Sequence, residues 1–378
     1  MTSNEGSKST YEQWLEQEGL PITEGYGIED VTQVARGPWS RMGGYGGFIQ
    51  LRGTVEGERG VYVGEIPSGQ ALNPEKHLYE EVIYILRGHG GTEVWSEAQR
   101  KTSFEWGPGS LFSPPLNSWH RLFNGGRDPV LFLAVTNAPH MMDLFHNAEF
   151  IFNCDYQFKD RFAGEKEYFN AGNKRYQKGW QNIWETNFIP DVMAAQLDDK
   201  PWKAAGGKTT QFEISGNIIV GHIANWPVGK YHRAHYHGPG ALIVGLKSKG
   251  YVLMWSKDLG TRPYENGHED KVVKVDWSLG SIYSPPDGWF HQHFNTGREP
   301  ARHLAIRTGS RLYVSAARRL QGVDFMQLDI DEGGSIIDYE KEDPEIRRRY
   351  EEALKLDGVE CQMPPVSKPD RDGKGNSR

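Results

Sequence analysis

The stretch that decides the fold reads Gly229-Lys-Tyr-His-Arg-Ala-His-Tyr-His237, and its partner reads Pro286-Asp-Gly-Trp-Phe-His-Gln-His-Phe-Asn295. On a β-strand successive side chains point to opposite faces, so His235 and His237 present both imidazoles to the same side. His291 arrives on a second strand, after a Pro-x-Gly turn. Three neutral imidazoles on one face of a cavity suit a divalent transition metal and leave coordination positions open. The pattern predicts a metal site made of these three histidines.

The glycines around the histidines add weight to this interpretation. An isolated His-x-His pair is a weak signal, because a histidine on a strand is more often solvated or hydrogen-bonded than bound to a metal. Here Gly229 precedes the pair and Gly280 opens the second run. The two runs resemble the motifs of the cupin superfamily, Gly-x5-His-x-His-x(3,4)-Glu-x6-Gly and Gly-x5-Pro-x-Gly-x2-His-x3-Asn. The second motif matches at every defined position, whereas the first lacks its Glu, where Ala241, Leu242 or Ile243 stands.

A repeat within the chain sets its organisation. The two copies read Trp106-x2-Gly-Ser-x2-Ser-Pro-Pro115-x4-His120-x2-Phe-Asn124-x-Gly-Arg-x-Pro129 and Trp277-x2-Gly-Ser-x2-Ser-Pro-Pro286-x4-His291-x2-Phe-Asn295-x-Gly-Arg-x-Pro300, at a constant offset of 171 residues. Such a match indicates a duplication, and each copy holds its own strands, glycines and pair of motifs. We therefore expect an all-β core of two tandem cupin barrels, of the double-stranded β-helix or jelly-roll kind, with a few peripheral helices.

Turn residues and short apolar runs divide the chain into five parts. Thr10 to Gln13 has the form of a capping box that opens a short helix, and Asp343 followed by Pro344 starts another near the carboxyl end. Residues 1–9 and 367–378 are polar and are expected to be disordered. The predicted parts are an N-terminal arm (1–43), a first barrel (44–139), an ordered connection (140–208), a second barrel (209–315) and a C-terminal extension with a helix and a tail (316–378).

The composition indicates a globular protein that acts on a small molecule. Its 378 residues carry a net charge of −7 with a pI near 6.0, and the basic residues are scattered among acids, which argues against nucleic acid as a partner. The sequence shows no signal peptide and no run near the roughly 18 apolar residues of a membrane span, so we expect a cytoplasmic protein without a membrane partner. Cys154 and Cys361 are too few for a disulfide framework. We expect a homo-oligomer.

The first barrel carries a different set of metal-ligand residues. The positions that match the motifs hold Glu75, His77, Glu81 and His120, so Glu replaces the first histidine and the motif's own Glu is kept. Burying two carboxylates without partners is costly, which favours either a bound cation or a neighbouring base, for which Arg87 and Lys76 are candidates. The cluster is a possible second metal site. The alternative is a hydrogen-bonded remnant in which Glu75 turns to solvent.

The second barrel resembles a known class of catalytic site. An apolar residue at the Glu position leaves three neutral ligands and a net charge of about +2, which accepts an anionic bidentate substrate and still holds a diatomic ligand. This set is similar to the non-haem Fe(II) sites of cupin dioxygenases that cleave carbon–carbon bonds, such as gentisate dioxygenase. The resemblance implies Fe(II) as the cofactor, and Mn, Ni or Zn also suit three histidines.

Side chains on the same face as the ligands are candidates for contact with substrate. By parity, Tyr231 and Arg233 face the cavity of His235, and His293 shares the face of His291. Arg233 suits bidentate binding of a carboxylate, or else a salt bridge at the rim. His293 is a candidate acid or base, or else a satisfied core histidine. We assign Arg233 and His293 as catalytic, and Tyr231 as a substrate contact that ordinary barrel packing would also explain.

Two more side chains complete the predicted substrate pocket. Arg307 lies on the strand after the second motif, and Trp289 stands two residues before His291. A tryptophan there can wall the pocket against an aromatic ring, although packing at a turn explains it equally well.

Three functions compete. The first is an Fe(II) dioxygenase, an oxidoreductase in which a small phenolic acid or dicarbonyl chelates the metal through two oxygens, O2 takes the remaining position and a C–C bond is cleaved. The second is a metal-dependent lyase, decarboxylase or isomerase that uses no O2. Oxalate decarboxylase-like bicupins generally carry three His and one Glu, so the missing Glu counts against it. The third is a non-catalytic bicupin that binds a small ligand, although barrel packing does not require three histidines.

Overall fold

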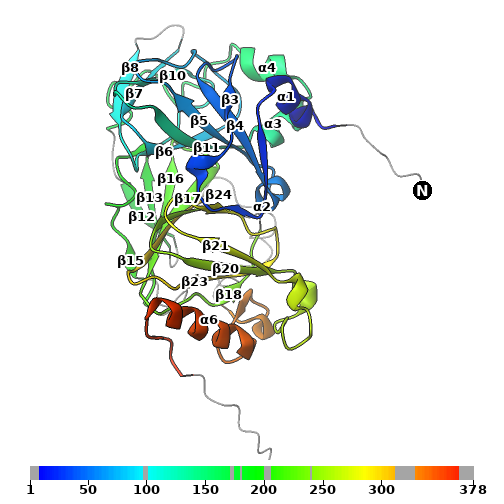
Figure 1. Cartoon of the computed structure of the whole chain (residues 1–378). Coiled ribbons are helices and arrows are strands. Elements are labelled where there is room, and N and C mark those ends of the chain that lie inside the picture. Colours follow the sequence, from blue (N-terminus) through cyan, green and yellow to red (C-terminus); the bar gives the residue numbers. More distant parts are fainter. Residues whose placement is uncertain are drawn as a thin grey trace, which may run out of the picture.

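The residues that the structure describes form four β-sheets with few helices (Figure 1). The computed structural model describes residues 8–96, 101–170, 174–178, 181–199, 206–238, 241–310 and 328–365. Two barrels, each made of one large and one small sheet, lie one above the other in Figure 1. No helix in these ranges combines the length and the apolar character that a membrane span requires. The predicted all-β, two-barrel fold is confirmed.

The first barrel joins an eight-stranded sheet to a three-stranded one. The large sheet has the order β1-β4-β5-β11-β6-β9-β14 with β3 paired to β4, and the small sheet has the order β10-β7-β8. Its strands are β1 (Ile22–Gly25), β3 (Gly37–Pro38), β4 (Tyr45–Leu51), β5 (Gly60–Ile66), β6 (Glu81–Arg87), β7 (Gly90–Trp95), β8 (Thr102–Trp106), β9 (Leu111–Phe112), β10 (Trp119–Asn124), β11 (Val130–Thr136) and β14 (Phe188–Ile189).

The second barrel repeats this plan. Its large sheet has the order β12-β13-β16-β17-β24-β19-β22-β2 with β15 paired to β16, and its small sheet has the order β21-β20-β23-β18-β25. Its strands are β2 (Gly27–Ile28), β12 (Lys174–Lys178), β13 (Gln181–Thr186), β15 (Asp198–Asp199), β16 (Lys208–Ile214), β17 (Ile219–Trp226), β18 (Ala234–His235), β19 (Leu242–Lys247), β20 (Gly250–Trp255), β21 (Val273–Trp277), β22 (Ile282–Tyr283), β23 (Phe290–Asn295), β24 (Ala301–Thr308) and β25 (Ile336–Ile337).

The two barrels exchange strands. β2, which follows the first strand of the chain, pairs with β22 of the second barrel, and β14 from the middle of the chain pairs with β9 of the first. The backbone hydrogen bonds just after these two strands are also equivalent. Val31 N donates to Gly280 O, and Val192 N donates to Gly109 O, both at 2.9 Å. The sequence predicted an arm (1–43) and a connection (140–208) outside the barrels. The structure shows that both segments contribute strands to the sheets, and that each also reaches into the opposite barrel.

The described ranges contain five α-helices, most of them near the two ends of the molecule in Figure 1. They are α1 (Thr10–Glu18), α2 (Arg52–Glu56), α3 (Ala138–Phe145), α4 (Ala148–Asn153) and α6 (Pro344–Asp357). The capping box of α1 is formed by Ser9 and Glu12, one residue earlier than Thr10–Gln13, because the Ser9 hydroxyl accepts from the Glu12 N–H. The helix α6 starts as predicted, with Asp343 as N-cap. The predicted tail, 367–378, lies outside the described residues, as does most of 1–9.

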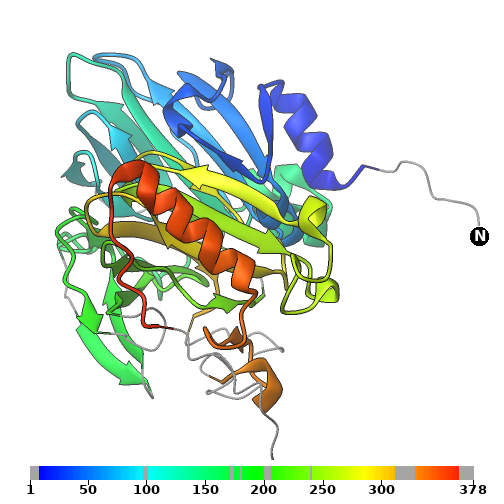
Figure 2. The ribbon, with the colours of Figure 1, turned by 60° about the horizontal axis from the view of Figure 1, so that its bottom comes forward.

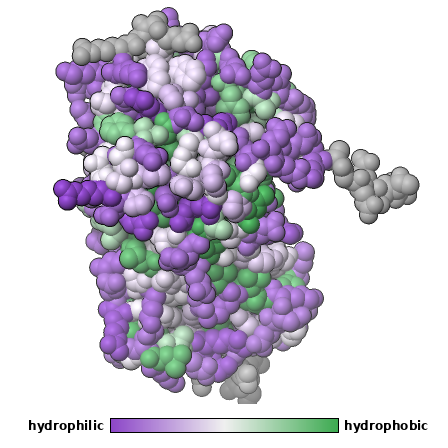
Figure 3. All heavy atoms as spheres, turned by 45° about the horizontal axis from the view of Figure 1, so that its top comes forward, coloured by the Kyte–Doolittle hydropathy of each residue, from purple (hydrophilic) through white to green (hydrophobic). Residues whose placement is uncertain are grey.

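Alternate side chains of the strands in the large sheets face either the interface between the barrels or the interior of their own barrel. On β24, Leu304 and Ile306 join one apolar cluster with Leu131 and Leu133 of β11, so the outer faces of the large sheets pack on each other. Ala305, in between, joins the interior of the second barrel. The α6 helix lies across the small sheet of that barrel (Figure 2). Hydrophilic side chains predominate on the face shown in Figure 3, and hydrophobic ones form separate areas.

Candidate metal centres

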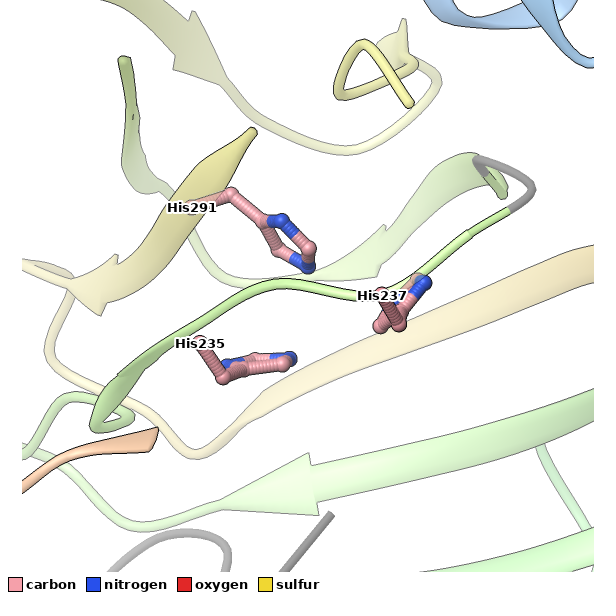
Figure 4. Close-up of side chains that lie close together, drawn as sticks. All are labelled: His235, His237 and His291. Carbon is pink, nitrogen blue, oxygen red and sulfur yellow. The ribbon is translucent and has the colours of Figure 1, made fainter. Parts of the chain in front are cut away.

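The three predicted histidines lie together inside the second barrel (Figure 4). His235 on β18 stands directly opposite His291 on β23, and their ring centroids are 4.4 Å apart. His237 follows just after β18, with its ring 4.8 Å from that of His291. One nitrogen from each ring lies within 4.8 Å of the others. Small side-chain movements toward the centre of this triangle would bring each nitrogen to within ~2 Å of a transition metal bound there.

Hydrogen bonds to the backbone orient two of these rings. His235 Nδ1 lies 2.9 Å from the carbonyl oxygen of Arg233, and His291 Nδ1 lies 3.1 Å from that of Trp289. A carbonyl oxygen only accepts, so Nδ1 must carry the proton and Nε2 is left with its lone pair. Such backbone bonds are the usual support of a metal-ligating imidazole. The donor set therefore fits a divalent transition metal held through Nε2.

Strand register identifies the residue at the position of the missing Glu. Leu242 pairs with Ile306 in the second barrel as Val82 pairs with Val135 in the first. The residue before each is therefore equivalent, which aligns Ala241 with Glu81. Of the three residues that the sequence left open, Ala241 takes this position, and it is buried in the barrel interior.

A β-bulge overturns the parity argument for Tyr231. Tyr231 pairs with Phe294 and His235 with His291, so the first strand has one more residue than its partner between these pairs. One extra residue exchanges the faces of the strand. Tyr231 therefore points away from the histidines, is fully buried in the outer core with Tyr350, and donates to a carboxylate oxygen of Glu342. The prediction that it faces the cavity is wrong.

The two predicted arginines lie in different surroundings. Arg233 makes an ion pair with Asp338, so the structure shows the salt bridge that was its alternative interpretation. Arg307 continues the inward-facing set of β24, because Leu304 and Ile306 face the interface between the barrels. Extending the register by one residue beyond the Leu242–Ile306 pair places Ala241 opposite Arg307. Arg307 therefore starts from the wall where the first barrel has Glu81, and its Nη1 lies 3.4 Å from Gly309 O.

Two of the remaining candidates line the same barrel. His293 lies behind the three histidines, with its ring centroid 5.5 Å from that of His291. Burial lowers its pKa well below the ordinary value, and His232 and His291 lower it further. Trp289 is half-buried at the turn before His291, 6.2 Å from the ring of Tyr26, which comes from the beginning of the chain. Its contact with a substrate stays a prediction.

A segment that the sequence did not connect with the site supports the ligand strand. β25 (Ile336–Ile337) pairs with β18, with Ile336 opposite His235. Tyr236 N donates to Ser335 O at 3.1 Å, and the Tyr339 hydroxyl donates to Tyr231 O at 2.7 Å. We call residues 328–343 the C-terminal strap. No local pattern in the sequence indicates these contacts, which join positions about a hundred residues apart.

Glu342 of the strap predicts a pH dependence of stability. Burial raises its pKa from 4.5 to about 7, against the opposing effect of hydrogen bonds from Tyr231 and Gln292. Since its folded pKa lies above its unfolded pKa, the folded state binds more protons between these values, and the stability should fall as the pH rises from about 4.5 to 7. Glu342→Gln should remove this contribution and raise the unfolding free energy at pH 8 by about 1–3 kcal/mol.

Urea unfolding of both proteins at pH 5 and pH 8 measures this effect. Glu352→Gln, on the exposed surface of α6, is the matched control and should leave the pH slope unchanged. A Glu342→Gln protein that is less stable than wild type at pH 8 would show instead that the ionised carboxylate stabilises the strap.

The first barrel gathers its four predicted side chains as well. Glu75 stands opposite His120 as His235 does opposite His291, and the four ligand atoms lie within 4.8 Å of one another. His77 and His120 direct Nδ1 to the carbonyl oxygens of Tyr79 and Ser118, at 2.8 and 3.0 Å. Their Nε2 atoms and Oε2 of Glu81 are buried without a hydrogen-bond partner in the described ranges. Such convergent, unsatisfied donor atoms fit a cation.

Charges around the first cluster are already compensated in part. Burial alone would raise the pKa of Glu81, but its contacts with His120 and His77 outweigh burial and hold the pKa below its usual range. Glu75 is paired with Arg41 of the N-terminal arm, and the Tyr62 hydroxyl donates to Glu81. The expected bases are elsewhere: Arg87 is exposed at the end of β6, and Lys76 reaches Asp155. Arg41 was missed because its segment is remote in sequence.

The class of protein follows from these two barrels. Each barrel encloses its own cluster from its own pair of motifs, so the chain has the bicupin fold that its sequence resembles. No family model and no curated protein matches the chain.

Similar solved structures are of oxalate decarboxylase. One, on a structural element that modulates proton-coupled electron transfer, is 15% identical with a TM-score of 0.48 and covers 75% of this chain and 77% of its own. Another, on substrate binding and reaction specificity, is 12% identical with a TM-score of 0.49 and covers 80% and 82%. The enzyme from Bacillus subtilis is 12% identical with a TM-score of 0.47 and covers 76% and 77%. Such values assign neither a substrate nor a reaction to this chain.

Proposed function

We propose that the protein is an Fe(II)-dependent dioxygenase whose second barrel cleaves a C–C bond of a small, oxygen-chelating, anionic substrate. The observation that carries this proposal is the difference between the two barrels at one wall. Glu81 and Thr136 of the first barrel correspond to Ala241 and Arg307 of the second. The carboxylate of Glu81 is replaced by the methyl group of Ala241, and an arginine stands on the neighbouring strand. The wall that would repel an anion therefore attracts one.

The chain's own residues have distinct roles in this proposal. His235, His237 and His291 hold the metal through Nε2, and the backbone bonds described above fix the first and third. Arg307 binds a carboxylate of the substrate, for which its planar fork of donors is suited. Trp289 covers the aromatic or dicarbonyl part. His293, behind the ligands, donates or accepts a proton at Nε2.

The bound metal would supply a common binding point for two substrate oxygens and O2. The residues of the barrel provide the open space and the apolar surroundings of this site. Ala241 leaves open the position that Glu81 fills in the first barrel, and the apolar side chains of Ile243 and Met254 in the same interior exclude water. A dry interior strengthens the attraction between Arg307 and an anion, because little water screens it.

Anaerobic reconstitution with Fe(II), followed by an oxygen-electrode screen of phenolic acids, catechols and 1,3-dicarbonyls, tests the proposal. We expect O2 uptake with at least one of these classes, in a one-to-one ratio with substrate consumed. Product formation under argon at the same rate would support a metal-dependent lyase or isomerase instead. Tight binding of these compounds without turnover, with Fe(II) or with Mn, Ni or Zn, would support a binding protein.

A further inference from the structure

Four inward positions carry polar side chains in the second barrel and apolar ones in the first. Strand register and matching backbone bonds pair Tyr283 with Phe112, His293 with Leu122, His303 with Phe132 and His232 with Leu72. All eight side chains are buried. The first barrel therefore shows how the same fold fills these positions when only packing matters.

Three of the polar side chains form a hydrogen-bonded chain. The Tyr283 hydroxyl lies 2.8 Å from His293 Nδ1 and 3.1 Å from His303 Nδ1. Tyr283 is fully buried, and the rings of Trp226 and Trp277 lie 4.7 and 4.4 Å from that of His303. The chain thus runs from the three-histidine cluster into the aromatic interior of the barrel.

This hydrogen-bonded set of side chains is unfavourable for folding unless each of its polar groups has a hydrogen-bond partner. Moving an imidazole or a phenol from water into an apolar interior costs free energy that a hydrogen bond only roughly repays, whereas leucine and phenylalanine gain by the same transfer. The duplicated barrel carries the apolar version in the same fold. Packing therefore does not explain why three neighbouring polar residues occur in the barrel with the histidine cluster.

We propose that Tyr283 and His303 are positioning residues that fix the orientation and the tautomer of His293. The phenol has a single proton, so it donates to one Nδ1 and accepts from the Nδ1–H of the other. In their neutral forms the two imidazoles are therefore held in opposite tautomers. The tautomer of His303 therefore decides whether Nε2 of His293 is a hydrogen-bond donor or an acceptor toward the cluster. This inference rests on the proposed function only for the use that His293 makes of Nε2.

Nitrogen NMR of protein labelled with ¹⁵N-histidine tests the coupling directly, in the metal-free and the Zn(II)-loaded protein, without turnover. The signals of His293 and His303 are assigned by their loss in His293→Leu and His303→Leu. In wild type we expect one ring protonated at Nδ1 and the other at Nε2. In Tyr283→Phe, which introduces the residue of the first barrel, we expect this opposition to be lost. Because the measurement needs no reaction, it stands or falls separately from the dioxygenase assay.

The matched control is Tyr62→Phe, which removes a buried hydroxyl from the first barrel and should leave both signals unchanged. Identical tautomers in wild type, or opposite tautomers that persist in Tyr283→Phe, would overturn the proposal.

Thermal unfolding gives a second test. The triple variant Tyr283→Phe/His293→Leu/His303→Leu removes the hydroxyl together with both imidazoles that bond to it, so it should melt at least as high as Tyr283→Phe alone. A triple variant that melts lower would show that the chain serves packing. Leucine is used at 303, where the first barrel has Phe132, because the neighbouring strand carries the larger Trp226 at the position of Ile66.

Discussion

His237→Ala is expected to remove the metal from the second barrel, with an affinity loss of more than about 100-fold. Loss of a residue that merely supports a ligand already costs 10–100-fold, and this change removes one of the three ligands themselves. His237 is the least buried of the three, so its truncation disturbs the barrel interior least. Metal content per chain after dialysis against a weak chelator measures the effect.

Metal binding by the first barrel must be removed so that the measured metal content reports on the second barrel alone. A background of Glu81→Gln and His120→Ala removes two of its four ligand groups. On that background we expect about one metal per chain before the His237 change and close to none after it. Unchanged metal content in the combined variant, with normal thermal unfolding, would show that the three histidines do not hold the metal.

Single variants in the two barrels decide which barrel is catalytic. If the first cluster binds a cation, Glu75 and Glu81 cancel its charge and occupy positions that a substrate and O2 would need. Turnover should therefore survive Glu81→Gln far better than His235→Ala. The reverse order would assign the chemistry to the first barrel.

The fold and the ligands were predictable because their signals are local or repeated. The motif runs ending at Asn124 and Asn295 fix each barrel's turn, and in the structure both amides bind the carbonyl oxygen four residues further on, of Asp128 and Glu299. His235, His237 and His291 needed only spacing and a turn. These are properties of single segments, which sequence patterns report well.

The errors arose where one residue or a distant segment decides the geometry. Strand parity failed at Tyr231 because a bulge adds one residue without leaving a pattern in the sequence. Arg41, which pairs with Glu75, comes from a segment remote from the motif. The His293–Tyr283–His303 chain had a signal that was not used. A comparison of the two copies at the constant offset of 171 residues shows Phe112, Leu122 and Phe132 against Tyr283, His293 and His303.

Arg307→Gln is expected to weaken the binding of an anionic chelator by about 10- to 100-fold, the value of a hydrogen bond to a charged group. Salicylate and catechol are suitable probes, because both chelate a metal through two oxygens, but only salicylate does so with a carboxylate, whose second oxygen is left for Arg307. With Co(II) in the second barrel, their binding can be followed by the visible absorption of the metal. We expect the variant to lose affinity for salicylate and to keep its affinity for catechol and its metal content.

The comparison of ligands separates Arg307 from the fold around it. If Arg307 binds the substrate's carboxylate, as proposed, its charge should act on that carboxylate and leave the ring and the metal unaffected. Ala241→Glu would restore a carboxylate on the wall where the first barrel has Glu81 and should also weaken salicylate more than catechol. Ala241→Gln, of the same size, should affect the two ligands alike. If Arg307→Gln weakened both ligands equally, Arg307 would be a support of the barrel mouth, and the substrate's carboxylate would require another partner.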